Sequence, residues 1–273
     1  TYKLAKMNLA IRGIDAKIEL GDTLMNDKFP DLKVDYILAN PPFNVSDYQI
    51  NKSETHKWKY GLPPIGNANY AWLQHYVSKL APNGTAGIVL TNGSMSIDTA
   101  TEGQIRKELI ENDLVDCMVA LPAQLFYNTQ IPACLWFLSR NKTNHNFRNR
   151  NKNILFIDAR ELGTMISRKQ KELTDKHISK IADTYHNWRD KNWKKKYKDE
   201  PGFCKSADID EIRKNNYILT PGRYIEFKEA EDDGISFDVK MKKLTKELKE
   251  QMQKAGTLDA EIKKNLNKIG YKL

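Results

Sequence analysis

The chain has 273 residues, of which 40% are hydrophobic and 29% are charged, and its formal net charge is +9. No run of about 18 apolar residues occurs, which excludes a membrane-spanning helix. The three cysteines (Cys117, Cys134 and Cys204) and the five histidines lack metal-ligand or disulfide spacing, so we expect no metal site and a reducing, cytoplasmic compartment. The positive charge suits a polyanionic partner, although many basic proteins have none.

The first forty residues predict one helix and two strands. Apolar residues recur at helical spacing up to Gly13, and residues 14–20 then alternate apolar and polar side chains as a strand does. Gly21 and Asp22 would end this strand. Residues 34–39 form a short apolar run, which indicates a buried strand.

The second of these strands stops at Asn40-Pro41-Pro42-Phe43. The two prolines fix two φ angles and push Asn40 out of the helical region, so the turn is stiff. The Asn40 side-chain oxygen and a turn carbonyl can accept hydrogen bonds from an exocyclic amine, and Phe43 can stack on the ring that carries it. The alternative is an ordinary proline turn after a strand.

Residues 44–66 are polar and aromatic with almost no periodicity. A loop of this length inside a compact domain is usually a functional lid or a mobile segment. Trp58 and Tyr60 stand among lysines, a pattern that suits stacking on bases and contact with phosphates. The alternative is a surface loop whose Trp58 packs against the domain.

The rest of the chain alternates between expected helices and expected strands. A helix over 69–80 and another that begins at a capping box of Thr101 and Gln104 fall between strands at 85–91, 114–121, 131–139 and 153–158. This alternation predicts an α/β, doubly wound sheet, in which ligands bind off the carboxyl ends of the strands. Asp22 and Asn40 would both lie there.

The last stretch, residues 237–273, predicts two amphipathic helices that are interrupted at Gly256-Thr257. Apolar side chains recur there at spacings of three and four, with lysine and glutamate between them. Such helices need a partner face, which is either another protein or their own domain.

Three separated stretches of the chain, 40–47, 58–75 and 216–224, agree in order and spacing with a known family. Asn-Pro-Pro-Phe after a hydrophobic strand resembles the catalytic motif of S-adenosylmethionine-dependent methyltransferases that act on adenine N6. Together, the three stretches are similar to the modification subunit of type I restriction-modification systems, from the first residue to about residue 230.

The resemblance implies site-specific methylation of adenine N6 in double-stranded DNA, with S-adenosylmethionine as cofactor and with a specificity and a restriction subunit as partners. The basic loop at 141–152, which contains Arg150, would be beside the DNA. The implied site has three parts: a catalytic turn of Asn40, Pro41, Pro42 and Phe43, a cofactor contact through Asp22 and Asn40, and DNA contacts through Asn44, Trp58 and Tyr60. Asp22 is otherwise a common turn residue after a strand.

The family carries a Gly-rich strand-to-helix turn upstream, and no such turn precedes Asp22. We therefore expect a partial doubly wound sheet of the class I methyltransferase type, a carboxyl-terminal part of a longer subunit that would not methylate by itself. The expected domains are a catalytic domain at 1–160, a helical extension at 161–230, and a helical tail at 231–273 that contacts the specificity subunit.

Two other functions remain open. An amino-methyltransferase that acts on protein glutamine or on RNA would share the Asn-Pro-Pro-aromatic turn, but the long stretch at 58–75 and the helical tail argue against it. A scaffold that binds a partner without catalysis is the second, and the missing Gly-rich turn favours it for this chain.

Overall fold

A computed structural model describes residues 1–227 and 236–271 of the chain. The chain divides into two compact units, Thr1–Phe227 and Lys228–Leu273. The residues on the two sides of the expected boundary at residue 160 belong to one sheet. In that sheet, β8 (Cys204–Asp208) pairs antiparallel with β5 (Asn153–Asp158). The segment expected as a helical extension therefore contributes a strand to the main domain.

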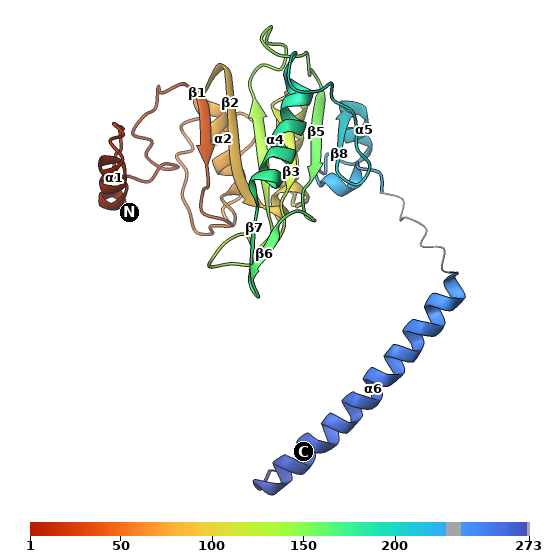
Figure 1. Ribbon diagram of the computed structural model, residues 1–273. Coiled ribbons are helices and arrows are strands. Elements are labelled where there is room, and N and C mark those ends of the chain that lie inside the picture. Colours follow the sequence, from red (N-terminus) through yellow and green to blue (C-terminus); the bar gives the residue numbers. More distant parts are fainter. Residues whose placement is uncertain (228–235, 272–273) are drawn as a thin grey trace. The chain divides into compact units, whose positions relative to one another are not determined.

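Six strands of the first unit form one mixed sheet in the order β1-β2-β4-β3-β5-β8 (Figure 1). The remaining bounds are β1 (Val34–Ala39), β2 (Leu80–Thr91), β3 (Val115–Ala120) and β4 (Ala133–Ser139). β1 is parallel to β2 and β3 is parallel to β5, while β4 runs antiparallel to both β2 and β3. Consequently β1, β2, β3 and β5 all end at the same side of the sheet, which we call the carboxyl edge.

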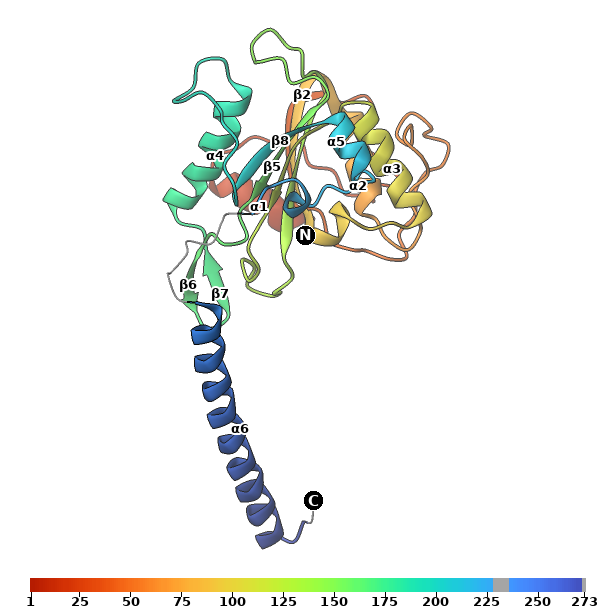
Figure 2. The ribbon, with the colours of Figure 1, turned by 90° about the vertical axis from the view of Figure 1, so that its right-hand side faces the viewer.

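Helices cover both faces of this sheet, which confirms the doubly wound α/β prediction (Figures 1 and 2). One core contains Met118 of β3 and side chains from α2 (Asn69–Lys79), α3 (Ala100–Glu111) and α5 (Ile209–Lys214). The other contains Cys117 and Val119 of the same strand and side chains from α4 (Asp175–Arg189). Successive residues of a strand point to opposite faces of the sheet, so β3 contributes side chains to both cores. The shorter elements are η1 (Asn92–Met95), η2 (Pro221–Arg223), β6 (Thr164–Ser167) and β7 (Gln170–Glu172).

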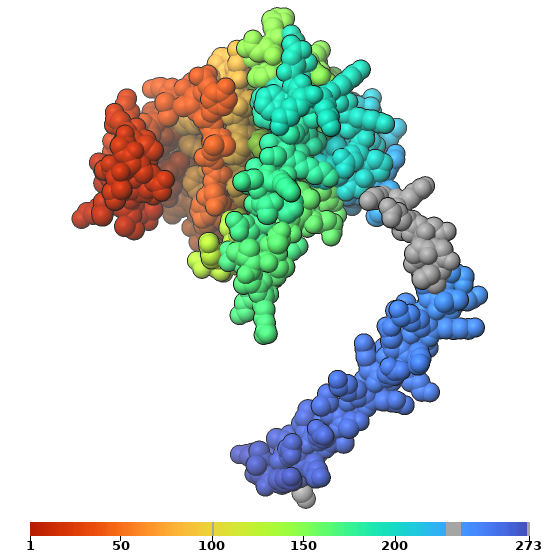
Figure 3. Space-filling view, viewed as in Figure 1, coloured from red at the N-terminus to blue at the C-terminus, as the bar shows by residue number. Residues whose placement is uncertain are grey.

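The amino-terminal part of the chain differs most from expectation. The helix is present as α1 (Tyr2–Ile11), but residues 14–20 form no strand. β1 forms as expected, yet it lies at the edge of the sheet with Tyr36 80% and Leu38 90% exposed rather than buried. In Figure 3, the red-orange atoms of this part of the chain are visible at the surface. A strand needs a neighbour for its backbone groups, and the described residues offer none to 14–20.

Two helix boundaries also differ from the prediction. α3 begins earlier than the expected capping box, because the Thr99 side chain accepts from the Glu102 backbone N–H at 3.3 Å and donates to the Glu102 carboxylate at 2.8 Å. The tail is one helix, α6 (Phe237–Lys268), which continues through Gly256. One interior glycine costs a helix only about 1 kcal/mol, which is too little to break it. Within the described residues, no helix is long and apolar enough to cross a membrane.

The basic loop that was expected beside DNA is partly structural. Arg150 is 3% exposed, and its Nε donates to the fully buried Asp116 carboxylate at 3.1 Å. The Tyr185 hydroxyl of α4 donates to the other oxygen of Asp116 at 2.7 Å. This arrangement ties α4 and the loop before β5 to the middle of the sheet.

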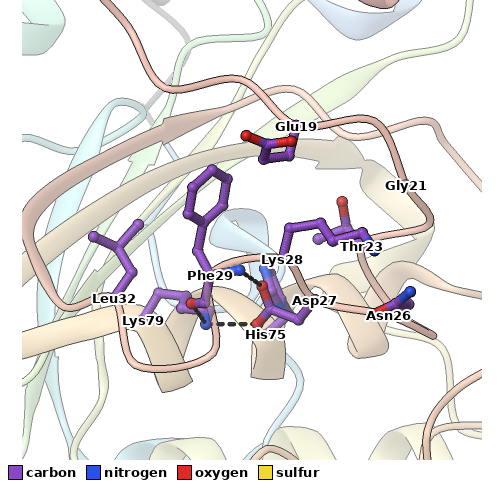
Figure 4. A pocket seen from close by; sticks show the side chains of 10 residues that line it. All are labelled: Glu19, Gly21, Thr23, Asn26, Asp27, Lys28, Phe29, Leu32, His75 and Lys79. Carbon is purple, nitrogen blue, oxygen red and sulfur yellow. Dashed lines mark hydrogen bonds and ion pairs between the residues drawn. The ribbon is translucent and has the colours of Figure 1, made fainter.

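A second buried ion cluster fixes the segment that carries Asp22. The Asp27 carboxylate, 4% exposed, pairs with Lys79 of α2 (Figure 4). It also pairs with the buried Lys57 at 3.0 Å. Burial opposes the charge on Asp27, but hydrogen bonds from Lys79, from the backbone and from Lys57 outweigh it and hold the pKa of Asp27 well below its usual range. The same aspartate thereby joins the amino-terminal segment, the 44–66 loop and α2.

His75 of α2 lies beside this cluster and is 6% exposed, and its Nδ1 has no hydrogen-bond partner among the described residues. Burial, and then the charge of Lys57, lower the pKa of His75 to about 4, although Asp27 acts in the opposite direction. The imidazole is therefore neutral at pH 7.

Removing the Asp116 carboxylate should destabilise the first unit strongly. Asp116→Ala leaves a buried guanidinium unpaired, and breaking such a pair costs about 3–5 kcal/mol of unfolding free energy. The control is Asp210→Ala, which removes an exposed partner of Arg213 and should cost about 0–1 kcal/mol. Urea unfolding monitored by tryptophan fluorescence checks both values, and equal costs would contradict the structural role of Asp116.

His75 should make the protein acid-sensitive. An unfolded histidine binds its proton near pH 6.5, whereas His75 in the folded chain does so only near pH 4. The stabilisation from a neutral His75 is thus complete above pH 6.5 and is lost as the pH falls toward 4, by about 3 kcal/mol in total. Urea unfolding between pH 7 and 4 should be less pH-dependent for His75→Gln than for the unchanged chain. His145→Gln, at an exposed site, is the control.

Candidate active site

Asn40 lies at the carboxyl edge, immediately after β1. The last residue of β1, Ala39, pairs with Ile88 of β2, and Pro41 is buried while Asn40 is exposed. No hydrogen bond engages the Asn40 side chain within the described chain. Its amide is therefore free to bind a ligand, and the strand and the buried proline fix its backbone.

A hollow of 380 Å³ opens beside Asn40 on the face of the sheet. Asn40 is the one polar side chain among its lining residues, which are Leu38, Ala39, Asn40, Gly87, Ile88, Val89, Leu135 and Phe137. An apolar hollow with a single well-placed polar group is the usual form of a site for a small apolar or aromatic ligand.

Two aromatic rings meet near the turn. The ring centroids of Phe43 and Phe126 are 5.8 Å apart, and their planes cross at 80°. Phe126 belongs to the segment that follows the carboxyl end of β3, so the topology brings it to Phe43 from 83 residues further along the chain. The sequence analysis missed Phe126. Its place just after a strand of a doubly wound sheet was the signal that could have found it.

Asn44 is exposed, but its polar groups are already engaged. Its side-chain oxygen accepts from Asn69 Nδ2 at 2.8 Å and from the Thr91 hydroxyl at 3.3 Å, and its backbone N–H donates to Asn69 Oδ1 at 3.1 Å. The structure thus joins Asn44 to α2 and to the end of β2, where sequence reasoning had expected a contact with DNA.

Trp58 and Tyr60 are both tied to the protein's own structure. Trp58 is 6% exposed, packs beside Leu24, and donates its indole N–H to a backbone carbonyl of the same loop. The Tyr60 backbone bonds to Gln74, about 7.5 Å along α2 from Asn69. These contacts favour the alternative in which the loop packs against its own domain.

Asp22 keeps one oxygen for a ligand. Its Oδ1 accepts from the backbone N–H groups of Leu24 and Met25 at 3.0 and 3.1 Å, which fixes the turn, and its Oδ2 has no partner among the described residues. Gly21 and Thr23 on either side line a hollow of 130 Å³. An exposed carboxylate oxygen on a fixed turn is suited to accept from an amine or a hydroxyl of a nucleoside. No cluster of possible metal ligands occurs in the described part of the chain.

The sequence of the chain also matches known proteins. A family model described as N-6 DNA Methylase matches residues 1–233. The type I restriction enzyme HindI methylase subunit of Haemophilus influenzae is 50% identical over 99% of this chain and 60% of its own length. The MjaIX methylase subunit of Methanocaldococcus jannaschii is 44% identical over 99% of this chain and 48% of its own length. The chain thus spans about half of the length of the curated relatives it matches.

Solved structures show the same fold. The methyltransferase subunit of a type I restriction-modification system from Streptococcus thermophilus superposes with a TM-score of 0.71 at 30% identity, over 82% of this chain and 46% of that one. The EcoKI M protein superposes with a TM-score of 0.65 at 18% identity, over 95% of this chain and 58% of that one. With the family model matching most of its length and a relative identical at half of the aligned positions, this chain belongs to the N-6 DNA methylase family.

Proposed function

We propose that this chain carries the target-base side of a DNA adenine-N6 methyltransferase and acts within the modification subunit of a type I restriction enzyme. The observation that carries this function is the free amide of Asn40 at the carboxyl edge, beside the paired rings of Phe43 and Phe126. The names of the relatives, which are methylase subunits of type I restriction enzymes, support the same function.

Methyl transfer to adenine N6 depends mainly on how the amine is positioned. The lone pair of adenine N6 is delocalised into the ring, and the base must leave the duplex before any pocket can hold it. The Asn40 amide oxygen and the Pro41 carbonyl would accept from the two N6 hydrogens and direct the lone pair outward. Phe43 would stack on the base and Phe126 would support that ring. Correct positioning can supply roughly 7–11 kcal/mol of the barrier.

S-adenosylmethionine is the cofactor of this reaction, and when bound it supplies an electrophilic methyl group. Asp22 would accept from its nucleoside part through the free Oδ2, and Asn40 would stand where that cofactor and the base meet. No residue of the turn needs to form a covalent bond. The three cysteines are all buried, which agrees with a direct transfer.

Duplex DNA, a specificity subunit and a restriction subunit are the partners we assign. The net charge of +9 favours a polyanion. The α6 helix has no buried residue, and its apolar side chains form one stripe: Met241, Leu244, Leu248, Met252, Leu258 and Ile262. A stripe of this kind is suited to pack on a helix of another subunit. We place this complex in the cytoplasm, where DNA is available.

Asn40→Ala should reduce methyl transfer to adenine in duplex DNA by at least about 100-fold, because misplacing a reacting group by 1 Å already costs that much. Transfer of labelled methyl groups is measured with this chain as part of the whole modification subunit, mixed with a specificity subunit. The unfolding free energy should stay unchanged, since the amide makes no internal bond.

Asn192→Ala, at an exposed position elsewhere in the first unit, is the matched control and should keep full activity. Undiminished transfer by Asn40→Ala would remove Asn40 from the mechanism. Transfer to protein or RNA but not to DNA would instead favour the wider amino-methyltransferase class.

A further inference from the structure

We propose that Asn69, the first residue of α2, is a positioning residue that holds the Asn-Pro-Pro-Phe turn in its active shape through Asn44. Asn69 is 2% exposed and contacts the residue directly after Phe43. It would touch neither base nor cofactor. This role rests on the proposed function, since it needs a base to be held at Phe43.

The two asparagines form a closed pair of hydrogen bonds. Asn69 Nδ2 donates to Asn44 Oδ1 at 2.8 Å, and the Asn44 backbone N–H donates to Asn69 Oδ1 at 3.1 Å. Both the side chain and the backbone of Asn44 are thus fixed by one amide. An ionised carboxylate at this position could accept from the Asn44 N–H but could not donate to Asn44 Oδ1.

The conformation of Asn44 explains why such a pair is needed. Its φ is +50°, in the left-handed region that residues with a Cβ rarely adopt. Asparagine tolerates this region better than most residues, but its neighbours still have to hold it there. If Asn44 relaxed to a negative φ, the chain direction after Phe43 would change and the ring would lose its orientation.

Asn69 is itself fixed by hydrogen bonds at the start of α2. Its own N–H donates to Asn67 Oδ1 at 3.0 Å. The next residue, Tyr70, is fully buried and donates its hydroxyl to the Ser94 carbonyl at 2.6 Å. The Ser94 hydroxyl in turn accepts from the indole N–H of Trp136 in the centre of the sheet at 2.9 Å. The turn is thereby connected to the protein core through α2 as well as through β1.

Gln74 of the same helix offers a matched comparison. It is also fully buried, and it also makes two bonds to loop backbone, accepting from the Tyr60 N–H at 3.1 Å and donating to the Gly61 carbonyl at 2.8 Å. It holds the 44–66 loop at Tyr60 and Gly61, whereas Asn69 holds the same loop at Asn44, next to Phe43. A residue that only stabilises the domain should behave like Gln74, and a residue that positions the turn should not.

The experiment compares Asn69→Ala and Gln74→Ala in the whole modification subunit, with a specificity subunit present, by amide hydrogen exchange and by methyl-transfer kinetics. For Asn69→Ala we expect the Asn44 amide to exchange at least about tenfold faster, and kcat to fall about 10- to 100-fold with less than a threefold change in KM for DNA. For Gln74→Ala we expect faster exchange at Tyr60, a protected Asn44 amide, and kcat within threefold.

Two further variants test whether Asn69 acts through Asn44. The double variant Asn44→Ala with Asn69→Ala should be no slower than the slower single variant, because the pair acts as a unit. Asn69→Asp keeps an acceptor for the Asn44 N–H but has no donor at neutral pH, so its kcat should lie between those of Asn69→Ala and the unchanged chain.

Several outcomes would overturn this role: full kcat in Asn69→Ala, an equal loss of kcat in Gln74→Ala, or fully additive losses in the double variant. If Asn40→Ala is inactive while Asn69→Ala is fully active, the proposed function stands and only the positioning role fails. If the unchanged modification subunit transfers no methyl group to DNA with a specificity subunit present, the proposed function fails and this role fails with it.

Discussion

The position of Asn40 depends on one pair of parallel strands. Among the described residues β1 has no neighbour except β2, and Ala39, the last residue before the turn, pairs with the fully buried Ile88. β2 in turn pairs with β4 in the middle of the sheet. A slip of one residue between β1 and β2 would move Asn40 by about 3.3 Å and reverse the facing of every β1 side chain. The prolines then convert this fixed starting point into a fixed turn.

A single helix organises the irregular segments around that turn. From its first residue to its last, α2 holds three of them by buried polar side chains: Asn69 holds Asn44, Gln74 holds the backbone at 60–61, and Lys79 holds Asp27. Buried backbone groups of loops need partners, and polar side chains such as these can provide them. Such polar networks specify one arrangement only when every member has its partner.

Most local signals were read correctly from the sequence, whereas several features that depend on distant parts of the chain were not. The proline turn and the helix from residue 69 follow from residue chemistry and short-range periodicity, and both are present. The expected strand at 14–20 failed because a strand is defined by a neighbour elsewhere in the chain. Trp58 showed that an aromatic residue among lysines does not reveal which way it points. At α3, two overlapping capping patterns competed, and the one at Thr99 prevailed.

The residues of the α6 tail are less constrained by burial than those around Asn40. Because none of the α6 residues is buried, the positions of its apolar stripe are free of the constraints of a core within the tail itself. The residues around Asn40 have no such freedom, since each is tied to the sheet or to α2. Over evolutionary time the stripe can therefore exchange one apolar side chain for another more readily than the residues around Asn40 can change.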